Sequence, residues 1–540
     1  MPDDGANHQT QQTAGGIIET LQSLIVAFVF AMAFRGFVLE GFVIPTGSMA
    51  PTLMGAHIRV RSPATGYEYA VDSAEIVMGQ HRSDRPIYDP TLSHQYPVIA
   101  VPSAVLAAQN RMGDRVLVLK YIDPFTAPAR WDVAVFKNPT DPVGEAPYYI
   151  KRMVGMPNET MLVADGDIFT GPPDAQTSAL RIERKPEHVQ RAVWQLISDS
   201  DYAPAEIQRL EAAMRQRWRG GPWQSSEGWE TKGKRAWSWD KATPASLAWN
   251  SEIIPIDDWN AYNIYRRDIP LYPTADLAIS AALDPLDPTA FNSTLDIGAR
   301  GRIFRFAVAP GTLTLSVLEA ESQKVVATAD FPLSATAKGS APHGQPLAFE
   351  FWHVDQRLSV YLAGDEIGHL DYDFGGPINR IVASHYGRTL EQYIANPTGQ
   401  RPTPTTLEWR FSGSPFTMRR VRVERDLYYR PEFLSAANQF PANGTAISGL
   451  GFAIDPMNPA RLGPTDHVMF GDNSGASKDS RLWGKSHPLV VSELGNDHPF
   501  IVPREMLIGK AWSVYFPSPI TLNPGGRAFI PDFGRLRFIR

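Results

Sequence analysis

The segment GFVIPTGSMAPTL (residues 41–53) follows directly after an apolar run and decides how the rest of the chain is interpreted. Its two prolines make it a poor continuation of a membrane helix, because proline lacks the amide donor that a helix interior needs. A small hydroxyl residue, Ser48, stands between Gly47 and Met49. The pattern indicates that the chain has left a bilayer and continues as strand and turn. It raises the question of why a tightly framed serine lies at that exit.

The composition indicates a mainly β protein with several domains. The 540 residues are enough for roughly two to four domains. The 46 prolines and 42 glycines favour turn-rich β structure over long helices. The mild net charge of −6 gives no reason to expect a nucleic-acid partner, which normally needs a basic face. The absence of cysteine excludes disulfides, a thiol nucleophile and cysteine-ligated metal sites.

Residues 16–35 are predicted to form a single transmembrane anchor behind a polar N-terminal tail, residues 1–15. The apolar stretch has roughly the 17–20 residues that a spanning helix needs. Two alternatives are a buried core helix and a cleavable secretory signal, because Ala31-Met32-Ala33 has the small-x-small form of a cleavage site. A cleavable signal normally begins with basic residues and residues 1–34 contain none, so a retained anchor is favoured. Arg35 codes the orientation only weakly, because long domains cross a membrane largely regardless of charge.

Ser48 can act as a nucleophile only beside a base, because a free hydroxyl is weak at neutral pH. The G-x-S-x-G motif is absent, and none of the 12 histidines lies in a recognisable triad motif. The alternative base is a lysine kept neutral by burial, and the best candidate is Lys151 in YYIKRMVGMPNET (148–160), a predicted strand followed by a turn. An ordinary lysine is only about 0.1% neutral at pH 7.4. Taken singly, Ser48 is more readily a turn residue and Lys151 a solvated strand residue.

A third block, VMFGDNSGASKDSRLWG (468–484), joins a strand end to a turn rich in Gly, Asp, Asn and Ser. The alternatives are a surface loop and a calcium-binding loop. The order of its acidic and amide residues does not match the spacing of an EF-hand. When this block is considered together with the Ser48 and Lys151 segments, a functional role for Ser48 and Lys151 becomes the better interpretation.

Together these blocks resemble bacterial type I signal peptidase, a membrane-anchored Ser/Lys endopeptidase of the S26 type. IPTGSMAPTL (44–53) matches the nucleophile box and GDRVLVLKY (113–121) matches a box that forms a structural strand. YIKRMVGMPNE (149–159) matches the lysine box, and residues 471–484 match the GDNS box. The four motifs stand in the family order behind an N-terminal anchor, and they leave most of the chain unassigned.

The resemblance implies a role for the polar residues of these boxes. Ser48 attacks the scissile carbonyl, and Lys151 takes its proton and then serves the leaving amine and the deacylating water. Ser477 orients the lysine amine by hydrogen bonding. The Thr46 hydroxyl binds the oxyanion together with the Ser48 backbone N–H.

The GDNS box carries one further match and one departure. Asp479 and Arg481 match a buried ion pair that supports this loop in the family. The family commonly has a charged pair directly after its GDN, where this chain has Ser474, Gly475 and Ala476. This departure puts a supporting contact of the loop in doubt, not the catalytic residues.

The resemblance also implies the substrate and the location. The substrate is the signal peptide of an exported preprotein, with small residues at positions −1 and −3. One apolar pocket discriminates by roughly 1–3 kcal/mol per methylene, so two pockets are needed for selectivity. The enzyme is then a single-pass protein of the cytoplasmic (inner) membrane, in contact with the lipid bilayer, with its catalytic body on the outer, periplasmic or extracytoplasmic face. The implied pocket lining is Phe42, Ile44, Met49, Tyr149 and Ile150.

The catalytic core is expected in two parts, residues 36–170 and 431–540, separated by a large insertion. Residues 171–269 are expected to be a mixed, Trp-rich region, in which the rings more often pack loops than form a platform for carbohydrate or peptide. Residues 270–430 have the short alternating strands of a β-sandwich. The stretch EFWHVDQRLSVYLAGDEI (350–367) is typical of a concanavalin-like or laminin-G-like hairpin. His353 and Asp355 in this hairpin are expected to be surface turn residues.

We therefore predict a mainly β, membrane-anchored Ser/Lys signal peptidase whose core is split by an inserted sandwich. No cofactor and no metal are expected, because no pair of histidines has ligand spacing such as H-E-x-x-H. The rival hypothesis is an anchored scaffold protein with a vestigial peptidase core, whose sandwich recognises a ligand of the cell envelope. The complete set of Ser48, Lys151, Ser477 and Thr46 favours the enzyme, because a vestigial core has little reason to keep all four groups.

Overall fold

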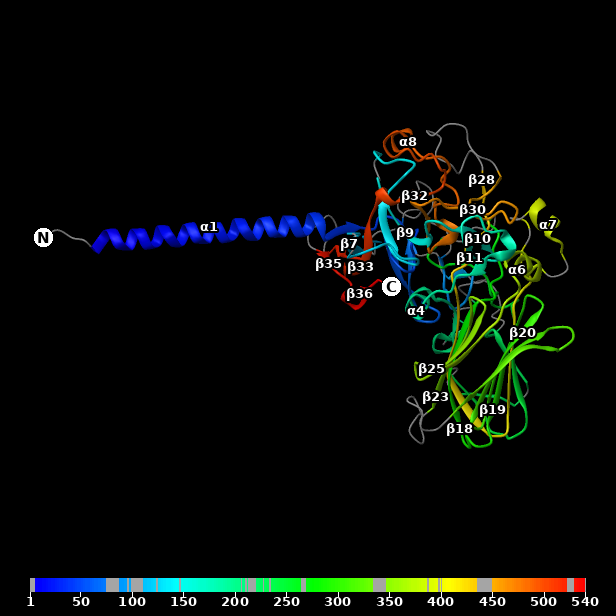
Figure 1. Cartoon of the computed structure of the whole chain (residues 1–540). Coiled ribbons are helices and arrows are strands. Elements are labelled where there is room, and N and C mark those ends of the chain that lie inside the picture. Colours follow the sequence, from blue (N-terminus) through cyan, green and yellow to red (C-terminus); the bar gives the residue numbers. More distant parts are fainter. Residues whose placement is uncertain are drawn as a thin grey trace.

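The computed structural model consists of one long N-terminal helix and a body built mainly of β-sheets, as the composition predicted (Figure 1). The helix extends away from the body, and the strands at the two ends of the chain lie together in it. The structure describes residues 5–73, 87–94, 97–98, 110–122, 125–144, 147–204, 206–208, 211, 220–226, 228–232, 235–263, 269–333, 346–385, 388–396, 399, 401–434, 449–521 and 529–539.

Helix α1 (Gly5–Phe37) contains the apolar segment predicted to cross a membrane. Its window Glu19–Phe37 is 19 residues long, has a mean hydropathy of 1.6 and is exposed throughout, and near its end the Gly36 carbonyl accepts a hydrogen bond from Lys120 Nζ. The window ends two residues later than the expected anchor, and the helix begins within the expected polar tail. One apolar N-terminal helix of this length fits a single membrane anchor.

The main sheet combines strands from both ends of the chain. Strands from residues 39–155 alternate in it with strands from residues 466–538, so a large insertion separates the two parts of one sheet. Most strands carry apolar side chains toward three buried clusters that enclose the sheet. The order is β1 (Leu39–Val43), β7 (Arg115–Lys120), β33 (Leu507–Phe516), β8 (Val133–Lys137), β9 (Tyr148–Gly155), β31 (Asp466–Phe470) and β32 (Val502–Pro503), with β36 (Arg537–Phe538) paired to β33.

Smaller elements surround the main sheet. A four-stranded sheet contains β12 (Arg181–Ile182), β11 (Asp167–Gly171), β10 (Thr160–Ala164) and β30 (Ala460–Arg461). A three-stranded sheet contains β3 (Glu68–Asp72), β2 (His57–Arg61) and β6 (Asn110–Arg111). Three two-stranded sheets are formed by β4 (Ile87–Tyr88) and β5 (Pro97–Val98), β28 (Phe433–Leu434) and β29 (Gly449–Leu450), and β34 (Ile520–Thr521) and β35 (Phe529–Ile530). Short helices are α4 (Glu187–Val193), α6 (Pro377–Ser384), α7 (Leu390–Ala395) and α8 (Pro488–Leu494).

The insertion forms two antiparallel sheets that share one large apolar core. Alternating side chains of strands such as β20 point into this core, which is the pattern expected for stacked sheets. The first sheet has β15 (Glu230–Lys232), β16 (Ala236–Trp239), β27 (Phe416–Arg425), β18 (Leu277–Pro285), β23 (Leu347–Val354), β24 (Arg357–Leu362) and β25 (Asp365–Asp371), with β13 (Gln195–Asp199) paired to β27. The second has β14 (Trp223–Ser225), β17 (Ala245–Trp249), β26 (Thr406–Ser412), β19 (Asn292–Ala299), β20 (Arg302–Ala309), β21 (Thr312–Glu319) and β22 (Val325–Pro332).

The expected boundary at residue 270 differs from this architecture. Strands β13 to β17 lie within residues 171–269, and they pair with strands of both sandwich sheets. Strands β13 to β17 of the Trp-rich region are therefore part of the sandwich, whereas β12 pairs with β11 of the four-stranded sheet. Strands β13 to β17 are only three to five residues long, so the alternation of side chains was too short to identify them in the sequence.

The expectation that His353 and Asp355 are surface turn residues is wrong. His353 is fully buried, and Asp355 is 3% exposed. The His353 ring stacks on Phe304 with a centroid distance of 3.8 Å, and its two nitrogens contact the Ala275 carbonyl and the Tyr372 hydroxyl. His353 is covered by residues of the sandwich itself, whereas Asp355 lies beside Asp167 of β11, in the four-stranded sheet, and pairs with Lys185.

Candidate active site

Ser48 and Lys151 come together from segments that are 103 residues apart. Pairing of β9 with β8 places Lys151 opposite Ala134, while Ser48 lies in the turn that follows β1. Lys151 Nζ donates a hydrogen bond to Ser48 Oγ at 2.6 Å. Lys151 is 4% exposed and Ser48 is 9% exposed. This is the geometry of a nucleophile and a base within hydrogen-bond reach.

The buried position of Lys151 changes its protonation. Burial lowers the pKa of Lys151 to about 8, against the opposing effect of the Asp479 and Asp472 carboxylates. At pH 7.4 a group with this pKa is neutral in about 20% of molecules, compared with about 0.1% for an ordinary lysine. A substantial fraction of Lys151 can therefore accept a proton near neutral pH.

The loop that carries Ser48 is tied to the GDNS box through Asp472. Thr52 Oγ1 donates to Asp472 Oδ2 at 2.5 Å, and the Arg152 guanidinium donates to both carboxylate oxygens at 2.8 and 2.6 Å. The side chains of Arg152 and Asp472 are fully buried. Bidentate pairs of this kind are strong and geometrically specific. Because Arg152 directly follows Lys151, the pair holds the three boxes in one arrangement.

Asp479 and Arg481 form a second buried ion pair beneath the GDNS loop. Arg481 donates to both Asp479 oxygens at 2.9 and 2.8 Å, and the Gly471 N–H donates to Asp479 at 2.9 Å. Arg481 Nη1 also donates to Ser474 Oγ at 2.8 Å. Ser474, where the chain departs from the family pattern, thus supports the loop through its hydroxyl.

Ser477 and Thr46 flank the dyad without contacting it by a hydrogen bond. The Ser477 hydroxyl is buried and has no hydrogen-bond partner among the described residues. It lies against Gly471, where an added Cβ would be 2.2 Å from Ser477 Oγ and 2.5 Å from the Ser48 carbonyl oxygen. Thr46 is exposed at the surface of the same turn as Ser48. The expected hydrogen bond between Ser477 and the lysine amine is not made in this structure.

Four of the five residues expected to line the substrate pockets lie in one apolar cluster. Phe42, Ile44, Met49 and Ile150 pack there beside the two catalytic candidates. Ile44 and Met49 are buried, whereas Phe42 and Ile150 are partly exposed. Tyr149 belongs instead to the neighbouring cluster around Phe136 and Trp483, and its ring centroid lies 5.4 Å from Lys151 Nζ.

The structure adds residues that the sequence analysis missed. Asn263 and Tyr262, both from the insertion, contact the Asn473 amide and Gly47 beside the nucleophile. Arg430, at the end of the insertion, donates its backbone N–H to Ser474 Oγ at 3.0 Å. No spacing or motif in the sequence relates these residues to the boxes, because their contacts span up to 215 positions.

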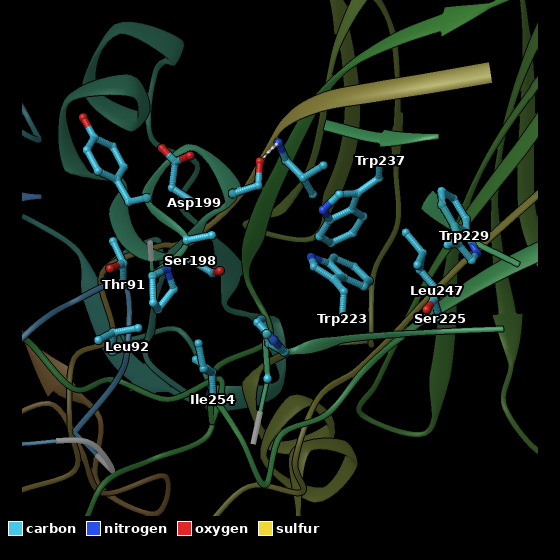
Figure 2. Close-up of a pocket in the computed structure, with 18 of the residues that line it drawn as sticks. Thr91, Leu92, Ser198, Asp199, Trp223, Ser225, Trp229, Trp237, Leu247 and Ile254 are labelled. Carbon is cyan, nitrogen blue, oxygen red and sulfur yellow. Dashed lines mark hydrogen bonds between the residues drawn. The ribbon is translucent and has the colours of Figure 1, made fainter. Parts of the chain in front are cut away.

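The tryptophans of the insertion mainly serve the sandwich core. Trp239 and Trp249 are buried in it, and Trp223, Trp229 and Trp237 pack against it. Figure 2 shows the last three beside a cavity of about 310 Å³, whose other walls include Leu92, Ser198, Asp199, Leu247 and Ile254.

A cluster of four buried carboxylates lies between the sandwich and the four-stranded sheet, at Asp167, Asp276, Asp355 and Asp426. Lys185 Nζ is 2.7 Å from Asp355 and 2.8 Å from Asp426. Arg380 pairs with Asp167 at 2.6 Å, and Arg300 pairs with Asp276 at 2.7 Å. The protein's own cations therefore supply the positive charge that a metal ion would otherwise bring to these carboxylates.

A family model described as signal peptidase, peptidase S26, matches residues 93–200. The matched segment contains Lys151, Arg152 and strands β7 to β11. This match supports a signal peptidase family. Peptidases of this family are bound to membranes, in agreement with the single apolar helix. No curated protein matches the chain.

Solved structures that resemble the chain contain β-sandwiches. The carbohydrate-binding module CBM66 from Bacillus subtilis is 9% identical with a TM-score of 0.21, covering 38% of this chain and 95% of that one. Sheep galectin-11 in complex with glycerol is 15% identical with a TM-score of 0.18, covering 28% and 90%. The botulinum neurotoxin serotype D binding domain is 6% identical with a TM-score of 0.22, covering 38% of this chain, which spans 44% of that domain. At these TM-scores the likeness carries no conclusion about ligands.

Proposed function

We propose that the protein is a membrane-anchored signal peptidase that removes signal peptides from exported preproteins with a Ser48–Lys151 dyad. The observation that carries the proposal is the 2.6 Å contact between the Ser48 hydroxyl and a buried lysine amine. The signal peptidase family match, which includes Lys151, supports it independently. The concanavalin-like character of the inserted sandwich, and any envelope ligand it binds, belong to the proposal as well.

The proposed reaction begins with neutral Lys151 accepting the Ser48 proton as the oxygen attacks the scissile carbonyl. The Ser48 backbone N–H and the Thr46 hydroxyl stabilise the negative charge that develops on the carbonyl oxygen. The Lys151 ammonium then protonates the leaving amine, which leaves an acyl ester on Ser48. Lys151, neutral again, deprotonates the water that hydrolyses this ester. The buried, unpartnered Ser477 hydroxyl is available to hold the amine when it turns away from Ser48.

The strands around Ser48 suit a substrate in extended conformation. β1 ends the main sheet, and β31 pairs only with the half of β9 from Arg152 to Gly155. Tyr148–Ile150 of β9 and Phe42 of β1 therefore offer edges that have no partner strand on one side among the described strands, and the Phe42 and Tyr148 rings lie 5.7 Å apart. An extended peptide can pair with such edges through its backbone. Small side chains at −1 and −3 fit the tightly packed cluster beneath them.

An apolar surface supports the location at a bilayer. α1 continues into β1, and the pairing order β1–β7–β33–β36 leads from the anchor to exposed aromatic and apolar side chains. Exposed apolar groups of this size are typical of membrane-contact sites, and tryptophan favours the interface. The surface comprises Trp512, Tyr515, Phe533, Leu536 and Phe538. The proposal places this surface on the outer leaflet of the cytoplasmic membrane.

The test is cleavage of a preprotein with an Ala-x-Ala signal site by the full chain in detergent. Wild type, Ser48→Ala and Lys151→Met are compared, with the cleavage position determined by mass spectrometry. Cleavage after the −1 alanine by wild type alone is expected. Activity that survives in both variants contradicts the dyad. No cleavage by folded wild type across several preproteins favours the scaffold hypothesis instead.

A further inference from the structure

Asn473 of the GDNS box holds the peptide group that carries the nucleophile. Its side-chain amide donates to the Gly47 carbonyl at 3.0 Å, and its backbone N–H donates to the Ser48 carbonyl at 3.1 Å. The Gly47 carbonyl and the Ser48 N–H belong to one planar peptide group and point in opposite directions. A hydrogen bond to the Gly47 carbonyl therefore fixes the direction of the Ser48 N–H, which is the backbone donor of the proposed oxyanion hole.

Asn263 of the insertion fixes the Asn473 amide in turn. The two side chains exchange reciprocal hydrogen bonds, each of 2.7 Å. The Asn473 NH₂ group has two hydrogens, one directed at Asn263 Oδ1 and the other at the Gly47 carbonyl. A flipped Asn473 amide would direct its oxygen at the Gly47 carbonyl oxygen, so the amide has one orientation, in which Asn263 accepts its second hydrogen and donates to its oxygen.

Tyr262 closes the other side of the same peptide. An added Cβ on Gly47 would lie 2.1 Å from Tyr262 Cε1, so the ring occupies the space that any side chain at position 47 would need. Tyr262 is 3% exposed, and its carbonyl accepts the Asp72 N–H at 2.8 Å. The buried Tyr262 ring therefore limits the space beside Gly47.

The segment that leads into Tyr262 and Asn263 is bonded to other parts of the insertion. Arg425, the last residue of β27, donates to the carbonyls of Asp258 and Trp259 at 3.0 and 2.9 Å. The Asp258 carboxylate is paired with Arg430 and accepts the Tyr272 N–H at 2.8 Å. The Asp258, Arg425, Arg430 and Tyr272 side chains are buried, so residues 258 and 259, which lead into Tyr262 and Asn263, are held by the folded insertion.

We infer that Asn263 is a positioning residue for the reaction, by which the insertion orients the Ser48 N–H through Asn473. The inference rests on the proposed function. It assigns the insertion a part in the active site: the catalytic core alone lacks the partner that orients the Asn473 amide. Asn263 itself touches neither the nucleophile nor the base, and its effect is transmitted by hydrogen bonds.

The test measures kcat and KM of the full chain carrying Asn263→Ala, with rates normalised to the folded fraction by circular dichroism. Loss of an oxyanion donor costs about 10²–10³-fold in rate, and loss of its orientation is expected to lower kcat by about 10–100-fold. KM and the pH of half-maximal rate should stay unchanged, because neither substrate binding nor Lys151 is altered. Asn250→Ala is the matched control, since the Asn250 side chain accepts the Glu252 N–H within its own turn, far in the chain from the boxes, and its removal should leave kcat at the wild-type value.

Combining Asn263→Ala with Thr46→Val adds a second measurement. Both residues serve the same oxyanion, so the combined loss in kcat should be smaller than the product of the single losses. A wild-type kcat for Asn263→Ala, beside an active wild type, overturns the positioning role alone. A changed KM with unchanged kcat overturns it too. If wild type shows no Ser48-dependent cleavage, the proposed function and the positioning role fail together.

Discussion

The protein buries two lysines in two environments, and their comparison shows what makes a lysine a base. Lys151 is 4% exposed and donates to a serine hydroxyl, and no carboxylate of the described residues lies in hydrogen-bond contact with it. The Lys185 side chain is 5% exposed and touches two carboxylates, Asp355 and Asp426.

The pKa values of the two lysines move in opposite directions. Burial lowers the pKa of Lys151 to about 8. Burial also acts to lower the pKa of Lys185, but the carboxylates of Asp355, Asp426 and Asp167 outweigh it and raise that pKa well above its ordinary value. Desolvation is thus common to both sites, and contact with carboxylates decides which lysine stays charged.

The largest expected difference between the two lysines is in activity. Lys151→Met should lower kcat/KM by about 10⁴–10⁶-fold, the range seen when one member of a serine-protease triad is removed. Lys185→Met should leave the activity of each folded molecule within a few-fold of wild type, because Lys185 contacts neither Ser48 nor Lys151. The measurement is cleavage of one preprotein, normalised to the folded fraction. Equal losses in both variants would show that the lysines do not differ in role.

The next largest effect is on stability, and here removal of Lys185 is the damaging change. Lys185→Met leaves Asp355 and Asp426 buried without their cation, which typically costs about 3–5 kcal/mol in the free energy of unfolding. Chemical denaturation followed by tryptophan fluorescence measures this difference. Lys185→Arg, which keeps the charge, is the matched control and should recover most of the loss. A Lys185→Met variant as stable as wild type would show that the cluster is neutralised by protons instead.

Lys151→Met should increase stability. A lysine whose folded pKa is about 8, against about 10.4 when unfolded, carries a penalty of about 3 kcal/mol that is complete below pH 8. The penalty shrinks as pH rises from 8, because the native state loses its proton first, and it is gone above the unfolded pKa. The gain from Lys151→Met should therefore be largest at pH 7 and small at pH 10.5. A variant that is less stable at pH 7 contradicts the assigned environment of Lys151.

The same contrast explains what the sequence could predict. Ser48, Lys151 and the Asp479–Arg481 pair belong to short boxes whose resemblance to the family singled them out as candidates, and the structure brings Ser48 to Lys151 and Asp479 to Arg481. Burial of Lys151 in a strand is the prediction from the sequence, and Lys151 is 4% exposed in β9.

Contacts between distant segments that no motif relates to one another could not be predicted. His353 is buried by Phe304, Ala275 and Tyr372, which are 19 to 78 positions away, and Asp355 is paired with Lys185, 170 residues away. Asn263 meets Asn473 across 210 residues. A polar residue in a hairpin or loop has the same local pattern whether solvent or another domain covers it, so only the tertiary fold distinguishes the two.

The smallest effect, and the one that separates the lysines most directly, is the pH dependence of cleavage. If neutral Lys151 is the base, kcat/KM should rise about tenfold per pH unit below a midpoint of about 8 and level off above it. Lys185 keeps its proton throughout this range because its pKa is raised, so it adds no second limb, and Lys185→Arg should give the same midpoint as wild type. Circular dichroism at each pH controls for unfolding, and a second preprotein of different charge controls for substrate titration.

A midpoint near 6.5 would indicate a histidine base, and a rate independent of pH between 6 and 9 would show that Lys151 does not titrate in the reaction. A midpoint near 8 that is the same for both preproteins would show that the rate depends on the protonation of one buried amine, Lys151. The Asp479 and Asp472 carboxylates partly offset the effect of burial on the pKa of Lys151 without forming an ion pair with it.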